Sequence, residues 1–283
     1  MRPEAPRCRL DKNWENTMHD LLKFIVKTSI KTKTKLLVVG DLLDTSQQPP
    51  WVVNLFLDTV DEADIFAGNH DFKYRNMNEI ENSSIGHILK NPKYRACVPE
   101  FEDGFFQYDK EILLCHRLVY SPENAGLAKF KTGIAANDLI EKAKEFDPEV
   151  KWILIGDNHH KFHYENDEGI HVVNPGSPMV FNAGMIGEEC GFYIIDTDKN
   201  TVDFHKVPDS EDLVTDQYLR DQESRSDSLK AIVDVMEDAE FETADFFEIC
   251  DVKEKDMDKE FQEFYEDIKT ETNTIYNKLK KGA

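Results

Sequence analysis

Four short apolar segments of this chain are each followed directly by residues of the kind that bind metal ions. The segments 36–39, 65–67, 112–115 and 152–155 have the length and the aliphatic content of buried strands. In an open α/β sheet the ligand binds beyond the carboxyl ends of the strands, where successive loops converge. We therefore expect one site built from Asp41 and Asp44, from Asn69, His70 and Asp71, from His116, and from Asp157, His159 and His160.

Amphipathic segments alternate with these strands. Residues 11–29 place apolar side chains at steps of three and four, which predicts a helix that covers one face of a sheet. The other predicted elements are helices at 50–60, 79–90 and 133–146, a hairpin of 105–108 and 111–115, and an antiparallel meander of 170–173, 191–195 and 201–207 in a second sheet.

Composition restricts the class of protein. The chain has 283 residues, of which 40% are hydrophobic and 32% charged, which is enough for one main domain and an appendage. No stretch reaches the ~20 apolar residues that a membrane span requires, and no apolar signal segment opens the chain, so we expect a cytoplasmic protein without membrane contact. The five cysteines form no C-x-x-C pair and are expected to be buried thiols in a reducing compartment.

The net charge of −22 argues against a general nucleic-acid coat, because phosphate binding depends on Lys and Arg. The charge is unevenly distributed: residues 209–283 hold 23 acidic and 10 basic residues, whereas residues 1–35 hold nine basic and four acidic. The basic N-terminal segment either meets an anionic substrate or is simply solvated. We predict a domain at 1–208 and an acidic helical C-terminal extension at 209–283, whose apolar series docks on its own domain or binds a partner.

The donor types suit a site for two metal ions. Two divalent ions about 3.5–4 Å apart can clamp the attacking and leaving oxygens of a phosphoryl displacement and can activate a water. Such a site needs a bridging carboxylate, and Asp41, which comes immediately after its strand, is the natural bridge. Because oxygen and nitrogen donors are mixed, manganese, iron or zinc is favoured over calcium.

The order of these motifs is similar to that of a known family. Gly40-Asp41-x-x-Asp44, Gly68-Asn69-His70-Asp71, His116 and Gly156-Asp157-x-His159 together resemble the calcineurin-like metallophosphoesterase superfamily. Segments 174–178 and 187–192 look like those that come after the last metal motif in SbcD-type DNA repair nucleases, and a phage origin stays open. The resemblance covers about residues 1–207.

This resemblance implies an α/β fold, namely an α/β/β/α sandwich of two mixed sheets flanked by helices. It also implies a role for each motif residue. Asp41 would bridge the two ions, with Asn69, His116 and Asp157 completing one metal site and His159 serving the other. His70, paired with Asp71, would stabilise the transition state or protonate the leaving oxygen, and Asp44 would hold the ligands in place. The candidates for substrate contact are Arg7, Arg9 and His160.

The implied function is metal-dependent hydrolysis of phosphodiester bonds by an activated water. The implied substrate is DNA, cut by an exonuclease or endonuclease of SbcD type in repair, recombination or replication, with an SbcC-like coiled-coil ATPase as partner. Mn²⁺ is the expected ion, with Mg²⁺, Fe²⁺ and Zn²⁺ as alternatives. Other functions left open are a small-substrate phosphodiesterase, a protein phosphatase and a catalytically impaired scaffold, and a homodimer is another possible assembly.

The chain departs from the family pattern in two places. The Asp-x-His motif that closes the family's first strand is missing, and residues 1–9 resemble the loop just after it. We expect an upstream start or an interrupted gene, with a single-metal variant or pseudoenzyme as the alternative. The second departure is Asp157, which stands where the family usually has His and which favours manganese or magnesium over zinc.

Overall fold

The computed structural model describes residues 1–73, 76–98, 104–124, 133–208 and 213–220. The chain divides into two compact units, Met1–Leu219 and Arg220–Ala283. The predicted C-terminal extension at 209–283 lies almost entirely outside the described residues, so the fold is that of the first unit alone.

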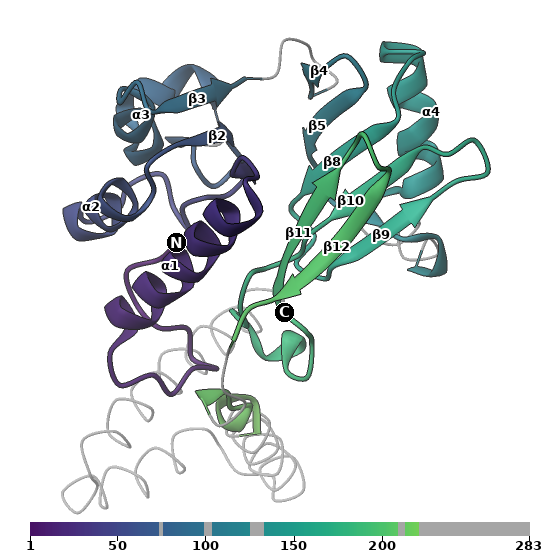
Figure 1. The fold of residues 1–283 in the computed structure, drawn as a ribbon. Coiled ribbons are helices and arrows are strands. Elements are labelled where there is room, and N and C mark those ends of the chain that lie inside the picture. The colour runs from purple at the N-terminus through teal and green to yellow at the C-terminus, as the bar shows by residue number, and fades with distance from the viewer. Residues whose placement is uncertain (74–75, 99–103, 125–132, 209–212, 221–283) are drawn as a thin grey trace, which may run out of the picture. The chain divides into compact units, whose positions relative to one another are not determined.

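The first layer is a parallel three-stranded sheet of order β1-β2-β3, formed by Leu37–Val39, Ala63–Phe66 and Tyr94–Cys97. Its outer face is covered by helices α1, α2 and α3, as Figure 1 shows. Because Phe56 of α2 and Ile85 and Ile88 of α3 are buried against the sheet, this half has its own apolar core. The helices are α1 (Trp14–Thr32), α2 (Pro50–Thr59) and α3 (Ser84–Leu89).

The second layer is a five-stranded mixed sheet of order β4-β5-β8-β10-β9. Its three central strands, β5, β8 and β10, are parallel, and both edge strands are antiparallel to their neighbours. Helix α4 (Ala136–Phe146) packs on its outer face through Leu139, Ile140 and Ala143. The strands are β4 (Phe105–Asp109), β5 (Ile112–His116), β8 (Trp152–Gly156), β9 (Phe162–Glu165) and β10 (His171–Asn174).

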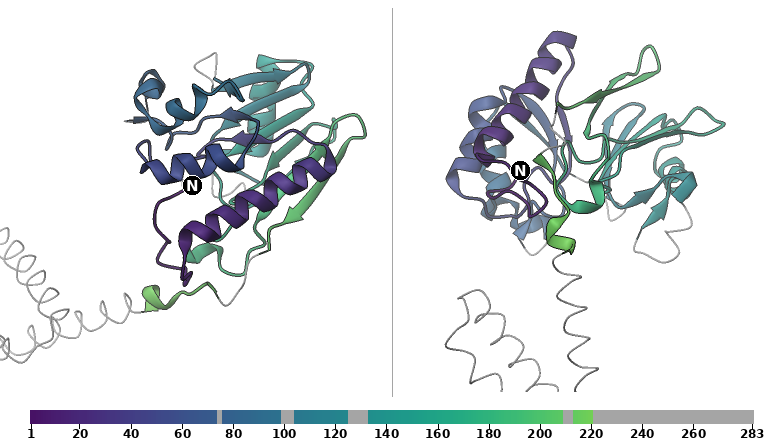
Figure 2. Two further views of the ribbon diagram at one scale, coloured as in Figure 1. Left: turned by 60° about the vertical axis from the view of Figure 1, so that its left-hand side comes forward. Right: turned by 90° about the horizontal axis from the view of Figure 1, so that it is seen from below.

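The two sheets face each other through a third apolar cluster. Phe66 of β2 packs there with Leu114 of β5 and Trp152 of β8. The antiparallel hairpin of β11 (Gly191–Asp196) and β12 (Thr201–Lys206) adds Tyr193 to the same cluster. The layers are thus helices, sheet, sheet and helix, which confirms the predicted sandwich (Figure 2). Further short elements are β6 (Val119–Tyr120), β7 (Ile134–Ala135) and the 3-10 helices Met77–Asn82 and Ala183–Met185.

The predicted meander is wrong in one strand. Strand β10 does not join β11 and β12 but pairs in parallel with β8 and antiparallel with β9. The β11–β12 hairpin is antiparallel as predicted. A strand with four buried residues, as β10 has, fits the centre of a sheet that is covered on both faces, and short turns in the sequence do not reveal which sheet a strand joins.

The predicted helix at 79–90 is divided in two. Ser83 has extended backbone angles and its hydroxyl accepts a hydrogen bond from the Gly86 backbone at 3.3 Å, so it caps α3 and ends the preceding 3-10 helix. Helix α1 begins with a similar cap, because the Asn13 side chain accepts from the Asn16 backbone.

Four cysteines are free and buried, as expected: Cys8, Cys97, Cys115 and Cys190. Of the helices that the structure describes, none is long and apolar enough for a transmembrane span.

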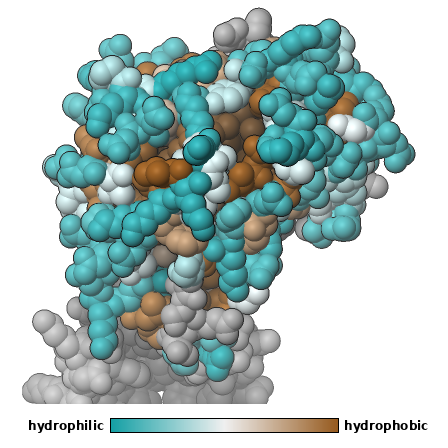
Figure 3. Space-filling view, in the orientation of Figure 1, coloured by the Kyte–Doolittle hydropathy of each residue, from teal (hydrophilic) through white to brown (hydrophobic). Residues whose placement is uncertain are grey.

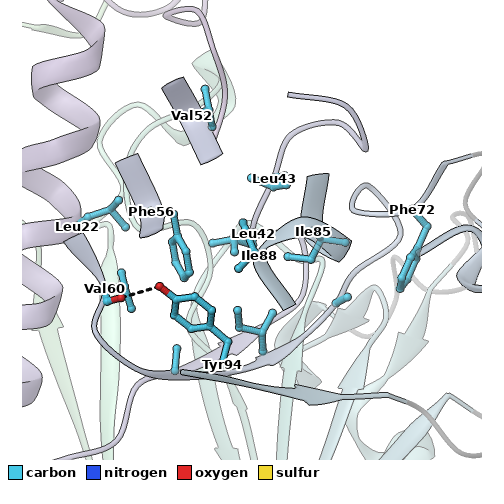
Figure 4. Close-up of a cluster of buried hydrophobic side chains, with 13 residues drawn as sticks. Leu22, Leu42, Leu43, Val52, Phe56, Val60, Phe72, Ile85, Ile88 and Tyr94 are labelled. Carbon is cyan, nitrogen blue, oxygen red and sulfur yellow. Dashed lines mark hydrogen bonds between the residues drawn. The ribbon is translucent and has the colours of Figure 1, made fainter. Parts of the chain in front are cut away.

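The core beneath α2 contains a buried polar contact (Figure 4). The Tyr94 hydroxyl donates to the Val60 carbonyl at 2.7 Å, between the end of α2 and the start of β3. We expect Tyr94→Phe to lower the free energy of unfolding by about 1 kcal/mol, because the carbonyl loses its donor. Urea unfolding measures this, and an unchanged midpoint would contradict it.

Candidate metal centre

Three ligand-type side chains converge at the carboxyl ends of three strands. Asp41 follows β1, His116 ends β5 and Asp157 follows β8. One ligand atom from each lies within 4.8 Å of the other two. His116 Nε2 is 3.1 Å from Asp41 Oδ2 and 3.9 Å from Asp157 Oδ1. The two strands β5 and β8 are neighbours in the five-stranded sheet, whereas β1 belongs to the other sheet, so the trio joins the two layers.

Both carboxylates of the trio lie on tight turns with a left-handed backbone. Asp41 has φ 48° and Asp157 has φ 84°, and each follows a glycine at the end of its strand. A residue with a side chain pays a cost of about 1–3 kcal/mol in such a region, and such residues cluster at functional sites. The turns direct the two carboxylates back toward His116, which explains how separate loops can deliver donors to one point.

The loop 68–71 wraps around Asp41. The His70 backbone N–H donates to Asp41 Oδ1 at 2.9 Å. The Asp71 side chain is fully buried and accepts from the backbone N–H groups of Gly68 at 2.9 Å, Leu43 at 2.9 Å and Leu42 at 3.3 Å. Asp71 thereby connects the loop after β1 to the loop after β2, and its role is to hold both loops in place.

The electrostatics of the trio favour a charged pair. Burial alone would raise the pKa of Asp41, but the hydrogen bond and charge of His116 outweigh it and hold that pKa below its ordinary value. Burial would likewise lower the pKa of His116, and Asp41 raises it instead. Burial raises the pKa of Asp71 to about 6, although its backbone hydrogen bonds act in the opposite direction.

The orientation of His116 suits a metal ligand. Its Nδ1 lies 3.2 Å from the Val39 carbonyl, to which it can donate a hydrogen bond. This contact leaves Nε2 facing the two carboxylates, and a second partner that fixes the tautomer is usual for metal-binding histidines. The imidazole is almost fully buried, with 6% of its side-chain surface exposed.

The trio and its surroundings fit a divalent cation. Asn69 Oδ1 is buried without a hydrogen-bond partner, which is costly unless another group satisfies it, whereas His116 Nε2 lies 3.1 Å from Asp41 Oδ2. Along the chain, Asn69 lies between two residues that are close to Asp41: the Asp41 carboxylate packs against Gly68, and the His70 backbone N–H donates to Asp41 Oδ1. Two carboxylates and an imidazole form a mixed oxygen and nitrogen donor set of the kind that Mn²⁺, Fe²⁺ and Zn²⁺ accept.

The other predicted site residues lie around this trio in different roles. His70 is exposed, and its Nδ1 lies 2.9 Å from the Asp44 carbonyl, not from Asp71, whose carboxylate is occupied by backbone N–H groups. The Asp44 side chain lies 3.7 Å from Arg2, so Asp44 supports His70 through its backbone. His159 is exposed and lies outside the trio, with its Nδ1 3.4 Å from Asn182 Nδ2.

The three candidates for substrate contact differ in accessibility. Arg7 is exposed, and so is His160, which lies 3.4 Å from Glu188. Arg9 is buried and forms two hydrogen bonds to the Asp11 carboxylate, at 2.7 and 2.9 Å. The guanidinium of Arg9 is therefore occupied in the interior, and its contact with substrate stays a prediction.

Two asparagines that the sequence did not single out shape the loop after β8. Asn174 donates to the carbonyls of Asn158 and His160, at 2.8 and 2.7 Å. Asn158 in turn donates to the Val119 carbonyl at 2.7 Å. They fix the loop that begins with Asp157. The Asn-Pro-Gly-Ser-Pro segment was visible in the sequence, but its contact with this loop depends on β10 lying next to β8.

Glycine is required at position 40 for two reasons. Gly40 has φ 91°, and a Cβ at this position would lie 1.7 Å from His116 Nδ1. We expect Gly40→Ala to displace the imidazole from the trio and to weaken Mn²⁺ binding about 10- to 100-fold, the usual range for lost support of a ligand. Calorimetric titration with Mn²⁺ measures this. Gly104→Ala is the control, because Gly104 also has a positive φ but no atom of the described residues lies within 4 Å of the added methyl group; equal affinities in the two variants would contradict the expectation.

Comparison with known proteins gives structural similarity only. No family model and no curated protein matches the chain. A novel archaeal phosphodiesterase is similar at 14% identity and a TM-score of 0.41, covering 66% of this chain and 92% of its own. Zinc-bound Vps29 from Entamoeba histolytica is similar at 15% identity and a TM-score of 0.33, and the match covers 61% of this chain and 97% of that one. A predicted phosphoesterase from Streptococcus pneumoniae is similar at 16% identity and a TM-score of 0.29, and the match covers 64% of this chain and 91% of that one. Likeness at this level carries no functional argument, so the site itself must indicate the function.

Proposed function

We propose that the protein is a metallophosphoesterase, a hydrolase of phosphoric esters. More specifically, we propose a manganese-dependent DNA nuclease of SbcD type that works with a coiled-coil ATPase partner. The observation that carries the first step is the joining of Asp41, His116 and Asp157 at one point, with the exposed imidazole of His70 held on the adjacent loop. The second step is supported by the ordered motifs of the sequence and by their resemblance to that nuclease family.

The residues of the site divide into holding and reacting groups. Asp41, His116, Asp157 and Asn69 would hold a divalent ion, which when bound neutralises charge on a phosphoryl oxygen and lowers the pKa of a water. His70 is oriented by two contacts: its backbone N–H bonds Asp41 and its Nδ1 lies against the Asp44 carbonyl. This leaves its Nε2 free to face a substrate, and in the imidazolium form that atom can donate a proton to the leaving oxygen.

The substrate class is tested by comparing two substrates. Purified protein with Mn²⁺ is incubated with linear double-stranded DNA and, separately, with an aryl phosphodiester. Degradation of both supports the nuclease proposal. Turnover of the aryl phosphodiester alone would favour the alternative, a small-substrate phosphodiesterase, and turnover of neither substrate with Mn²⁺, Mg²⁺, Fe²⁺ or Zn²⁺ would contradict the proposed activity.

His70 is expected to act in the reaction and not in metal binding. We expect His70→Asn to lower kcat for the aryl phosphodiester about 10²- to 10³-fold, the usual contribution of a general acid. Mn²⁺ affinity should remain within a few fold, because the His70 imidazole is not part of the trio. His87→Asn, at an exposed position on α3, is the matched control. Unchanged kcat in His70→Asn would contradict the assigned role.

A further inference from the structure

Three lysines form a row on the exposed face of α1. Lys23, Lys27 and Lys31 follow one another at steps of four residues, so they lie one above the other along the helix. All three are exposed, and within the described part of the chain no ion pair or side-chain hydrogen bond engages any of them. Figure 3 shows hydrophilic residues along α1. These three residues are called the lysine row below.

The sequence around the row is free of acidic residues. Residues 21–40 contain five lysines and no Asp or Glu, although the whole chain has a net charge of −22. Of these five, Lys35 has a carboxylate partner, since its Nζ lies 2.7 Å from the buried Asp64. Exposed lysines elsewhere also find partners, as Lys151 does with Glu111 at 2.8 Å. A cationic stretch without carboxylates in so acidic a chain indicates an anionic partner.

The stability of α1 accounts for only one member of the row. Lys31 lies in the last turn, where a cation complements the partial negative charge of the helix C-terminus. This effect falls off within the last turn, so it does not extend to Lys23 and Lys27. Lysine, glutamine and glutamate have similar helix propensities. Formation of the helix therefore does not require positive charge at positions 23 and 27.

The composition of the exposed face favours nucleic acid over protein or membrane. Protein–protein interfaces are depleted of lysine and enriched in aromatic residues, methionine and arginine. The exposed face of α1 is polar apart from Ile30, so it offers little apolar area to a protein. A membrane-binding helix turns its apolar face to lipid, whereas α1 buries that face in its own domain. Phosphate contacts need only cations, and the row presents them about 6 Å apart along a straight line.

The row lies on the half of α1 that is farther from the metal centre. The Trp14 indole N–H donates to the Arg2 carbonyl at 3.0 Å, and the Asp44 N–H donates to the Met1 carbonyl at 2.7 Å. Helix α1 therefore begins beside the loop that carries Asp41, and it ends before the start of β1. At 1.5 Å per residue its 19 residues span about 28 Å. A ligand on the row is thus remote from the reacting atoms.

We propose that the lysine row binds the phosphate backbone of double-stranded DNA. The row holds the duplex against α1 and raises its affinity, and it takes no part in hydrolysis. Binding is independent of base sequence, because phosphate contacts carry no sequence information. That the DNA held there is also the substrate rests on the proposed nuclease function, whereas the binding itself does not.

The test compares three variants of the full chain with the unaltered protein. The first replaces the lysine row by glutamine, and the second replaces it by arginine, which keeps the charge. Both residues are good helix formers, so α1 should remain stable, and urea unfolding checks this. The third variant is the matched control, which removes the same charge from three exposed lysines of the five-stranded layer. Its substitutions are Lys110→Gln, Lys142→Gln and Lys151→Gln.

DNA binding is measured in EDTA, so that hydrolysis does not interfere. A labelled duplex of about 20 base pairs, which is about 68 Å long and so longer than α1, is titrated at several salt concentrations. In the glutamine variant we expect at least about tenfold weaker binding, and a slope of log affinity against log salt that is smaller by about three, one for each phosphate contact. The arginine variant and the control should bind within about twofold of the unaltered protein. Turnover of an aryl phosphodiester with Mn²⁺ should be equal in all four proteins.

Several outcomes would overturn the proposal. No binding of the duplex by the unaltered protein, or an unchanged affinity and salt slope in the glutamine variant, would exclude the row as a DNA surface. An equal loss in the control would show a response to net charge alone. Labelled poly-glutamate that binds as tightly as the duplex, and loses affinity in the glutamine variant, would assign the row to an acidic polypeptide. If the row binds DNA but neither DNA nor the aryl phosphodiester is hydrolysed, the binding surface stands and the proposed enzymatic function fails.

Discussion

Asp41→Asn is expected to abolish hydrolysis, lowering kcat/KM by about 10⁴-fold, and to remove detectable Mn²⁺ binding. Asp41 is the only residue of the trio that comes from the three-stranded sheet, and its carboxylate contacts both His116 and the His70 backbone. Asparagine keeps the shape but loses the charge and one acceptor oxygen, so both the ion and the position of His70 are affected. Losses of this size are typical when one member of a catalytic unit is removed.

Calorimetric titration and turnover of an aryl phosphodiester check this prediction separately. Asp61→Asn is the matched control, because Asp61 is 90% exposed and its carboxylate lies 3.7 Å from Lys93 on the surface. The control should bind Mn²⁺ and turn over substrate as the unaltered protein does. Normal Mn²⁺ affinity in Asp41→Asn would show that the trio is not the metal centre, whatever happens to the activity.

The convergence of Asp41, His116 and Asp157 could be predicted because it results from a general property of sheets. Each residue comes directly after an apolar run that forms a strand, and the ends of parallel strands meet at one edge. The pattern was less informative beyond the first residue after the strand. The exposed His159, two residues beyond Asp157, has its Nδ1 3.4 Å from Asn182 Nδ2 and lies outside the trio.

The hydrogen bonds of Asp71 and Arg9 could not be predicted, because each depends on the local path of the backbone. A His-Asp neighbour pair suggests a charge pair, yet adjacent residues in a loop often point apart. Here Asp71 turns inward to three N–H groups while His70 remains exposed. Arg9 looked free in a basic segment, but Asp11 lies two residues away and binds it in the interior. Burial of charged residues with partners is a property of packing, not of composition.

The fold class could be predicted from the sequence, but the neighbours of one strand could not. Helical and strand periodicity identified most elements, and the sandwich results from apolar faces that must be covered. The pairing of β10 with β8 was not predictable, since a buried four-residue strand carries no mark of its neighbours.

Asp71→Ala is expected to lower the free energy of unfolding by about 3 kcal/mol or more. The substitution leaves the N–H groups of Leu42, Leu43 and Gly68 without their acceptor, and a buried unsatisfied donor costs about 1–3 kcal/mol. The loss is smaller than three full penalties, because the buried carboxylate is itself costly, as the rise of its pKa to about 6 indicates.

Urea unfolding without added metal measures the effect of Asp71→Ala apart from any ion. Asp71→Asn separates the causes, because it keeps one acceptor oxygen and the volume of the side chain but loses the charge. We expect its loss in unfolding free energy to lie between that of the alanine variant and zero. Since Asp71 connects the loop that carries Asp41 to the loop that carries Asn69 and His70, Mn²⁺ affinity should fall in the same order. Stability lost with Mn²⁺ affinity unchanged would show that the two loops keep their positions without this carboxylate, and would limit Asp71 to a role in folding.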